Sequence, residues 1–467
     1  MMKKQLILGI ALAVLLAPQV LPGDSQQETI HGVQNSPSAA SLNPLDMGDT
    51  PGLPRIMPVR RQVEVATTIL RRRLDTILPV ALRDAGLDMW LIICQEDNLD
   101  PVYKTMIPMD TWPKVLQILI FFDRGKEGGV ERINLSMTDT LDLYDKPWKG
   151  GNHPEQWRLL SEIISKRDPK RIGLNIGTVN WAAGGLTYNL YNQLVQALPQ
   201  KYVDRLTSAE NACTRWAMTL TEDELELYPH ISSIARGIIA QCFSPSSITP
   251  GVTTSKDLEW LFWQICLEHG LEQSFKPYFV IVRSDAEAAK HPLSDRIIRR
   301  GDLLICDVGI RYLGLFTDHQ EMAYVRHIGE TDAPEGLKNL LLANNRLQNI
   351  FMNAFKRGLT GNQLLENILS SAREAGLPSP IIFSHSLGLF VHEPGPVIGL
   401  PWEQKPLPGR GDIRLEYNSC YAMELAIVDT VPEWNNEQVP CQTEQIVKFT
   451  ENGCQPLDSV QTRYHLI

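Results

Sequence analysis

Two aspartates interrupt apolar runs in the stretch LLICDVGIRYLGLFTDHQEMAYV, which covers residues 303–325. The pattern predicts a strand, a turn and a second strand, with Asp307 and Asp318 inside otherwise buried sheet. If the turn is Arg311–Gly314, the two aspartates face each other with Cβ atoms roughly 4.5–5.5 Å apart. A buried unpaired carboxylate is costly, so this pair requires a divalent cation, a shared proton or an arginine partner.

Further candidate ligands follow in three apolar stretches downstream. His385 and His392 lie in FSHSLGLFVHEP, Glu424 lies in CYAMELAIV, and Glu444 lies in CQTEQIVKF. Taken singly, such a histidine is usually a core residue and such a glutamate usually lies at a strand edge. Taken together, carboxylates with one imidazole favour a divalent ion such as Mn²⁺, Co²⁺, Zn²⁺ or Fe²⁺.

The residues before this region predict a separate α/β domain from about 55 to 214. The stretch 63–86, VEVATTILRRRLDTILPVALRDAG, is typical of a helix with Gly86 at its C-terminal end. Three short apolar runs, MWLIIC, LQILIFF and RIGLNIG, are typical of strands. No phosphate-binding loop accompanies them, so we expect this domain to have a structural role.

Residues 215–467 contain two similar helical units, which indicates a duplicated architecture. Each unit has a threonine N-cap candidate, Thr254 or Thr360, followed three residues later by Asp257 or Gln363. Each ends at a glycine followed by leucine. We expect two halves, each built from a pair of strands and a helix.

Length, charge and the first residues limit the class of protein. The chain has 467 residues, enough for two or three domains, and a net charge of -10, which argues against nucleic-acid binding. Lys3 and Lys4 precede an apolar run from Leu6 to Ala17, a pattern typical of a signal peptide. We therefore expect a signal peptide at 1–23, a flexible leader at 24–54, export to the periplasm or the medium, and no stable membrane insertion of the mature chain.

The eight cysteines do not indicate a disulfide scaffold, and the absence of C-x-x-C argues against a thiolate zinc site. Cys94, Cys306 and Cys420 lie in apolar runs and are expected to be buried thiols. Cys441 and Cys454 flank a predicted hairpin and could approach each other.

The candidate ligands also carry a family resemblance. The segments DVGIRYLGLFTD, HSLGLFVHE, MEL and TEQIVKFTENG resemble those of the pita-bread metallopeptidases: methionine aminopeptidase, aminopeptidase P, prolidase and creatinase. The resemblance covers roughly residues 215–460 and is closest to the Xaa-Pro peptidase branch. It implies an α+β protein, with a pita-bread catalytic domain at 215–467 preceded by a creatinase-like α/β domain at 55–214.

The resemblance implies a role for each candidate residue. Asp307 would hold one metal ion, with both oxygens. Asp318 and Glu444 would bridge two divalent ions, and His385 and Glu424 would complete the second site. Glu424 would also be the general base, His392 would hydrogen-bond the scissile carbonyl, and His291 would bind substrate.

Four positions depart from the family pattern. Where this chain has Ile381, relatives usually have a histidine, and where it has Gln442, they usually have an arginine. At the positions of Gln320 and Glu321 they usually have a threonine and an arginine. Strict Xaa-Pro specificity is therefore not fixed. We expect an exported dinuclear peptidase that acts on dipeptides or peptide N-termini, and we keep a homodimer among its expected assemblies. The alternatives are a non-catalytic pita-bread binding protein and a creatinase-like amidinohydrolase.

Overall fold

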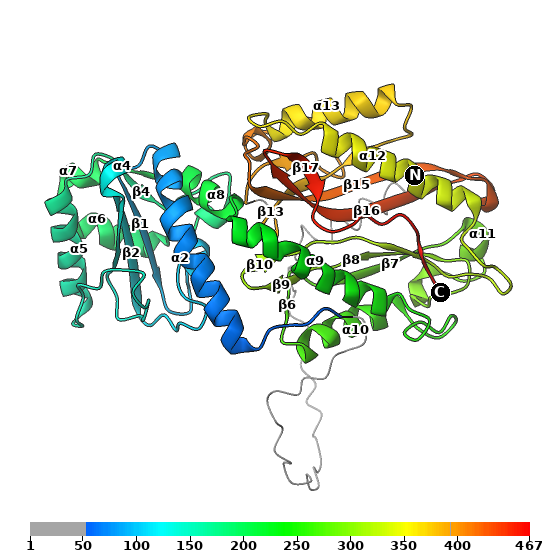
Figure 1. Ribbon diagram of the computed structural model, residues 1–467, viewed down its shortest axis with the longest axis horizontal. Helices are drawn as coiled ribbons and strands as arrows, with labels where there is room; N and C mark the ends of the chain where they lie inside the picture. The colour runs from blue at the N-terminus through cyan, green and yellow to red at the C-terminus, as the bar shows by residue number, and fades with distance from the viewer. Residues whose placement is uncertain (1–52, 393) are drawn as a thin grey trace, which may run out of the picture.

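The computed structural model describes residues 53–392 and 394–467. The predicted signal peptide and all but the last two residues of the predicted leader lie outside this part. The described residues form two domains, seen side by side in Figure 1. Among these residues, no helix is long and apolar enough to cross a membrane.

The first domain is an α/β layer structure, as predicted. Its five-stranded sheet has the order β3-β2-β1-β4-β5, with β1 antiparallel to β2 and parallel to β4. The strands are β1 Met89–Gln95, β2 Leu116–Asp123, β3 Val130–Asn134, β4 Ile172–Leu174 and β5 Leu206–Ser208. The helices are α2 Val59–Asp84, α3 Pro101–Lys104, α4 Gly125–Gly128, α5 His153–Arg167, α6 Tyr188–Ala197 and α7 Gln200–Val203, with the 3-10 turn η1 Trp181–Ala183.

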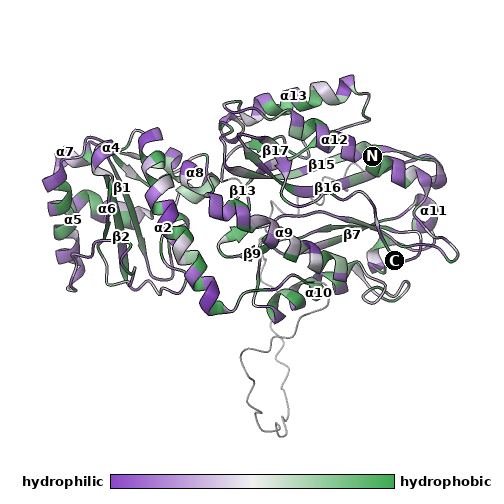
Figure 2. Ribbon diagram, viewed as in Figure 1, coloured by the Kyte–Doolittle hydropathy of each residue, from purple (hydrophilic) through white to green (hydrophobic). Residues whose placement is uncertain are grey.

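Sequence patterns explain these elements. Strand β1 is buried along six of its seven residues, and Figure 2 shows β1 and β2 as largely hydrophobic beside helices of mixed character. Helix α2 ends before Gly86, whose φ of 63° lies in the left-handed region that glycine adopts readily. The run RIGLNIG forms a strand only over Ile172–Leu174, shorter than expected.

The second domain has two halves, each with a pair of helices and a sheet. Helix α8 Glu210–Met218 packs against α2 and η1 of the first domain and leads into the first half. That half contains α9 Glu222–Cys242, α10 Ser255–Glu268, β6 Glu272–Gln273, β7 Tyr278–Val282, α11 Asp285–Ala288, η2 Leu293–Asp295, β8 Leu303–Asp307, β9 Ile310–Tyr312, β10 Leu315–Phe316 and β11 Met322–Tyr324. The second half contains α12 Glu335–Asn353, α13 Gly361–Glu374, β12 Ile381–Ile382, β13 Ser384–Leu387, β14 Val397–Ile398, η3 Arg410–Asp412, β15 Ser419–Val431, η4 Pro432–Trp434, β16 Glu437–Thr450 and β17 Gly453–Pro456. The C-terminal strand β18 His465–Leu466 returns to pair with β11 of the first half.

The two larger sheets of this domain lie between the helix pairs, and a third, three-stranded sheet has the order β10-β9-β6. Figure 1 shows α12 and α13 over β15 to β17 on one side, and α9 and α10 beside β7 and β8 on the other. One sheet has the order β18-β11-β8-β7 and the other contains β14-β13-β15-β16-β17. The predicted capping boxes are present in both halves, at Thr254 of α10 and at Thr360 of α13. The expected duplication is therefore confirmed in one feature, since α10 and α13 begin with the same type of N-terminal cap.

The register of the β9–β10 hairpin differs from the prediction. Tyr312 pairs with Leu315, and Leu313 and Gly314 have φ values of 54° and 85°, so the connection is a two-residue type I′ turn. Val308 bridges to His319 further down the ladder. The turn thus lies one residue later than we expected, and the prediction of directly opposed aspartates is wrong.

The observed register keeps the two aspartates on one face of the hairpin. With Val308 opposite His319, Asp318 lies opposite Gly309 and Asp307 lies opposite Gln320. The aspartates are diagonal neighbours, because the register change equals one full side-chain period. Gly309 is required here, because an added Cβ would lie 2.0 Å from the carbonyl oxygen of Thr317.

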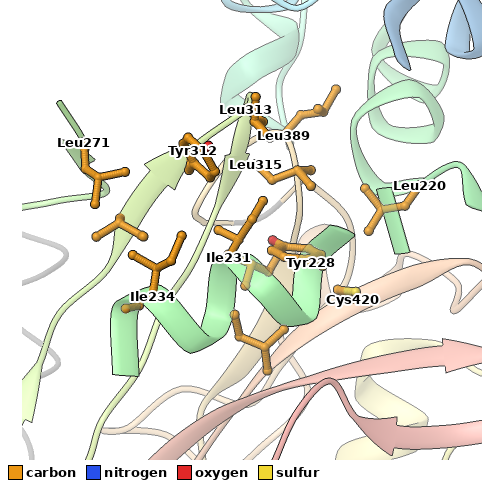
Figure 3. Close-up of a cluster of buried hydrophobic side chains, with 14 of the residues drawn as sticks. Leu220, Tyr228, Ile231, Ile234, Leu271, Tyr312, Leu313, Leu315, Leu389 and Cys420 are labelled. Atoms are coloured by element: carbon orange, nitrogen blue, oxygen red, sulfur yellow. The ribbon is translucent and has the colours of Figure 1, made fainter. Parts of the chain in front are cut away.

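Helix α9 holds this hairpin against the core. Tyr228 and Ile231 point from α9 toward Tyr312 and Leu315 of the hairpin (Figure 3), and all four side chains are buried. The hydroxyl of Tyr228 also donates to the carbonyl oxygen of Phe316. The strand that carries Asp318 is therefore fixed by apolar packing and by a backbone contact.

All eight cysteines are free thiols, and Cys94, Cys306 and Cys420 are buried as predicted. Cys441 pairs with Ile427, whereas Cys454 pairs with Phe449, eight residues further along β16 than Cys441. Eight strand residues span roughly 26 Å. The expected approach of Cys441 and Cys454 is wrong, because the hairpin turn at residues 451–452 lies far from Cys441.

Candidate metal centre

The predicted ligands come from both halves of the second domain. Asp307 ends β8 and Asp318 follows β10, while His385, Glu424 and Glu444 lie on β13, β15 and β16. In the second half, Glu424 is the direct register partner of Glu444, and His385 pairs with Ala422. These strands place all three side chains near one position of the sheet.

A backbone bridge joins the two halves at the same position. The amide of Gln320 donates to the carbonyl oxygen of Glu444 at 3.1 Å, and the amide of Glu444 donates to that of Gln320 at 2.9 Å. This pair of bonds ties the strand after Asp318 to β16. The acidic residues of the first half therefore meet those of the second half within one cluster.

Potential ligand atoms lie close together in three overlapping groups. Within each group, one atom per residue lies within 4.8 Å of the others. The groups are Asp307, Asp318 and Glu444; His385, Glu424 and Glu444; and Asp318, His385 and His392. All five predicted ligands are thus brought together, and Glu444 belongs to two of the groups. His392 lies beside Asp318 and His385 in the third group.

Burial makes this cluster electrostatically unfavourable without a compensating charge. Burial raises the pKa of Asp307 to about 7, against a hydrogen bond from Gln320 that lowers it. Burial and neighbouring carboxylates raise the pKa of Asp318, Glu424 and Glu444 well above their ordinary values. Each shift favours the protonated acid, so the cluster must hold protons or cations.

Unpaired atoms show which compensation fits. Asp318 Oδ1, both carboxylate oxygens of Glu444, and His385 Nε2 are buried without a hydrogen-bond partner. Several lone pairs that converge without donors are the arrangement that a bound cation satisfies. The donor set of four carboxylates and an imidazole therefore fits divalent ions of the hard to borderline class.

The imidazole of His385 is oriented for this role. Its Nδ1 lies 3.1 Å from the carbonyl oxygen of Ser386, so Nδ1 carries the proton and Nε2 presents a lone pair. Nε2 lies 3.7 Å from Asp318 Oδ2 and 4.0 Å from Glu424 Oε2. Burial lowers the pKa of His385 to about 4, so these contacts are not ion pairs, and the lone pair of Nε2 faces the carboxylates without a proton between them.

His392 and Arg410 lie at the rim of the cluster. His392 Nε2 is 3.8 Å from Asp318 Oδ2, and its ring centroid is 4.8 Å from that of His385. Burial lowers the pKa of His392 to about 3, and the positive charge of Arg410 lowers the pKa of both histidines further. The guanidinium of Arg410 stacks 4.7 Å from the ring of Trp181, which belongs to the first domain.

His291 is not among the clustered residues. It follows α11, where its backbone amide donates to the carbonyl oxygen of Glu287 and its carbonyl oxygen accepts from Arg283. Its expected contact with substrate stays a prediction.

The four departures from the family pattern have definite surroundings. Ile381 packs in a small apolar cluster with Phe383 of the same segment. Glu321 is buried and bonds to Arg236 at 2.6 Å and to His465 at 2.5 Å. Gln320 and Gln442 bond to each other, and Gln320 donates to Glu424.

Sequence reasoning missed the contributions of these glutamines and of Arg410. Gln320 and Gln442 were recognised only as departures, although a polar amide within an apolar strand is itself a signal of a buried hydrogen bond. Arg410 lies in the turn η3, in a stretch without periodic pattern. Nothing in its local sequence indicates proximity to His385 and His392.

A comparison with known families agrees with this geometry. The sequence profile of metallopeptidase family M24 matches residues 228–454. A protein named probable dipeptidase PepE from Mycobacterium bovis is 29% identical over 154 residues, which cover 30% of this chain and 40% of that protein. The matched stretch thus spans about two fifths of this curated relative.

Solved structures share the whole two-domain architecture. An X-Pro aminopeptidase from Thermotoga maritima is 19% identical, with a TM-score of 0.59 over 83% of this chain and 100% of that chain. An Xaa-Pro dipeptidase from Bacillus anthracis is 18% identical, with a TM-score of 0.55 over 88% of this chain and 100% of that one. Dipeptidase PepE from Mycobacterium ulcerans is 18% identical, with a TM-score of 0.54 over 86% of this chain and 98% of that one. These likenesses confirm the α+β pita-bread fold and the preceding α/β domain.

Proposed function

We propose that this chain, whose residues 228–454 match metallopeptidase family M24, is a dinuclear metal-dependent peptidase acting on dipeptides or on the N-termini of short peptides. The observation that carries the proposal is the set of buried, unpaired ligand atoms on Asp318, His385 and Glu444. Burying four carboxylates costs free energy of folding, and a protein that only binds peptides has no need of such a cluster. A creatinase-like amidinohydrolase is also disfavoured, because the ligand set is complete.

Asp307, Asp318 and Glu444 would hold one ion, and His385, Glu424 and Glu444 the other. When bound, such ions supply an activated water and polarise the scissile carbonyl. Mn²⁺, Co²⁺ and Zn²⁺ all suit this donor set.

The residues of the chain have separate tasks in hydrolysis. Glu424 takes the proton of the attacking water and returns it to the leaving amine. Burial, and then the charges of Asp307 and Asp318, raise the pKa of this carboxyl in the metal-free site. His392, neutral at the rim, donates an N–H to the developing oxyanion.

The substrate is best described as a short peptide with a free carboxylate. The positive charge of Arg410 is close enough to lower the pKa of both His385 and His392. In a dipeptide, the C-terminal carboxylate lies only a few bonds from the scissile carbonyl. A cation that pairs with this carboxylate would favour dipeptides over longer peptides. Relatives titled Xaa-Pro dipeptidase and X-Pro aminopeptidase make a proline-containing substrate the first to test.

The proposal includes export of the chain. The basic start and the apolar run from Leu6 to Ala17 support it. Export to the periplasm or the medium would place the enzyme among extracellular peptides.

One experiment tests the activity. Purified protein loaded in turn with Mn²⁺, Co²⁺ and Zn²⁺ is assayed on Xaa-Pro and other dipeptides and on short peptides. We expect hydrolysis of at least one dipeptide, abolished by a chelator and restored by metal. Absence of turnover by fully metallated protein would instead favour a non-catalytic peptide-binding role.

A further inference from the structure

Two buried glutamines form a hydrogen-bonded chain that ends on the predicted general base. Gln442 Nε2 donates to Gln320 Oε1 at 2.5 Å, and Gln320 Nε2 donates to Glu424 Oε1. Both glutamines have a relative exposure of 0%. Gln320 also donates a hydrogen bond to Asp307, which lowers the pKa of that carboxyl against the effect of burial.

The direction of this chain is fixed by hydrogen-bond chemistry. A carboxylate can only accept, so the amide nitrogen of Gln320 must face Glu424 and Asp307. Its oxygen then faces away and needs a donor, which Gln442 provides. Without Gln442, the amide of Gln320 could rotate and present its oxygen to the carboxylates.

The backbone of Gln320 cannot move away from this position. Its amide and carbonyl form the two bonds to Glu444 that join the halves of the domain. Gln445 Nε2 adds a bond of 3.4 Å to the carbonyl oxygen of Gln320. A side chain on so constrained a backbone has a defined reach to both carboxylates.

We propose that Gln320 is a positioning residue that selects which oxygen of Glu424 faces the metal site, and that Gln442 sets its orientation. This inference rests on the proposed function. Glu424 Oε1 is held by Gln320, while Oε2 lies 4.0 Å from His385 Nε2 inside the cluster. Glu424 is therefore left with one oxygen, Oε2, for a cation.

A neutral donor has an advantage over a charged one at this position. An arginine or lysine would repel divalent cations across a few ångströms of buried space. An amide N–H holds the carboxylate oxygens but leaves the negative charge of the cluster available to metal. The pair Gln320 and Gln442 therefore replaces a cationic partner without lowering the attraction for the ions.

The test compares metal affinity in Gln320→Met, Gln442→Met and the double variant. The apparent Kd for Zn²⁺ and Mn²⁺ is measured by competition with a chelating dye, and folding is checked by circular dichroism. Gln156→Met is the matched control, because Gln156 is a buried amide with two hydrogen bonds in the first domain. Loss of a group that orients a ligand typically weakens metal binding by roughly 10–100-fold.

We expect both single variants to weaken binding in this range, and the double variant to be no weaker than Gln320→Met, because the two residues act in series. The control should bind like the parent protein. Unchanged affinity in folded Gln320→Met, or additive losses in the double variant, would overturn the inference. If Gln320→Met does not fold, Gln442→Met alone decides, since it leaves Gln320 in place. A parent protein that binds neither metal would overturn the proposed function itself.

Discussion

Glu424 of β15 and Glu444 of β16 lie directly opposite each other as register partners in an antiparallel ladder. Two like charges at such a position destabilise a sheet unless a third group compensates them. Gln320 donates one hydrogen bond to Glu424, but both oxygens of Glu444 have no donor, and the nearby Asp318 and His385 add only further unpaired acceptor atoms. The ladder itself therefore creates the requirement for cations at this position.

The first prediction concerns metal content. Protein incubated with Mn²⁺, Co²⁺ or Zn²⁺ and then desalted should contain about two ions per chain, as expected of a dinuclear site. Asp318→Ala should lose most of this metal, because Asp318 contributes to two of the three groups of ligand atoms. Asp332→Ala, at an exposed carboxylate paired with Lys338, is the control. Equal metal content in the two variants would remove Asp318 from the site.

The second prediction concerns the general base. Glu424→Gln should lower kcat by roughly 10²–10⁴-fold, because the side chain keeps its shape but no longer accepts a proton. The unfolding midpoint should change little. Metal content must be measured in the same sample, because an amide whose oxygen accepts from Gln320 would turn its nitrogen toward the site. A fully metallated variant with parental kcat would refute the role of Glu424.

The third prediction concerns acid stability. Burial alone would raise the pKa of Glu321, but hydrogen bonds and charges from His465 and Arg236 lower it from 4.5 to about 2. A depressed carboxyl pKa contributes stability above the unfolded value, and this contribution is lost as pH falls from about 4.5 toward 2. The shift corresponds to on the order of 3 kcal/mol at neutral pH.

Glu321→Gln provides the corresponding measurement. Urea unfolding should show the variant less stable than the parent at pH 7, with the difference shrinking as pH falls below 4. The exposed ion pair of Arg158 and Glu162 serves for comparison, and Glu162→Gln should have a small effect at every pH. A difference between parent and Glu321→Gln that does not vary with pH would contradict the assignment.

The fourth prediction concerns substrate length. Arg410→Met should raise KM for a dipeptide by roughly 10–100-fold, because the variant loses a charge-assisted hydrogen bond to the C-terminal carboxylate of the substrate. The same dipeptide with an amidated C-terminus should be a poor substrate for the parent and should respond little to the variant. Lys405→Met removes an exposed cation from the same loop and should leave KM unchanged. Equal KM values for acid and amide in the parent would show that Arg410 does not bind the carboxylate.

The fifth prediction concerns the N-terminus. Expression in a secreting host should give a mature chain that begins near residue 24, because Lys3 and Lys4 precede a short apolar run. N-terminal sequencing of the purified protein checks this. Soluble protein that retains Met1 would show that the segment is not a cleaved signal.

The types and order of the ligands could be read from the sequence. Asp307, Asp318, Glu424 and Glu444 interrupt apolar strands, where a charge is too costly without a partner, so their local pattern already indicates a site. The helix starts at Thr254 and Thr360 were also predictable, because a capping box is a contact within four residues.

The hairpin register could not be read in the same way. The sequence around Gly314 suits more than one turn, and the choice depends on packing of α9 against Tyr312 and Leu315. The shared face of Asp307 and Asp318 was nevertheless predicted correctly, because moving the turn by one residue shifts each cross-strand partner by two residues, which is one full side-chain period.

The sequence by itself thus determined which residues carry the charge and on which side of their strands they lie. Only the tertiary structure decided which of them meet. The opposition of Glu424 and Glu444, the bridge from Gln320 to Glu444, and the approach of Arg410 to His385 and His392 all join distant segments. Local patterns record the cost of burying a group, whereas the identity of its distant partner depends on how the two halves of the domain pack together.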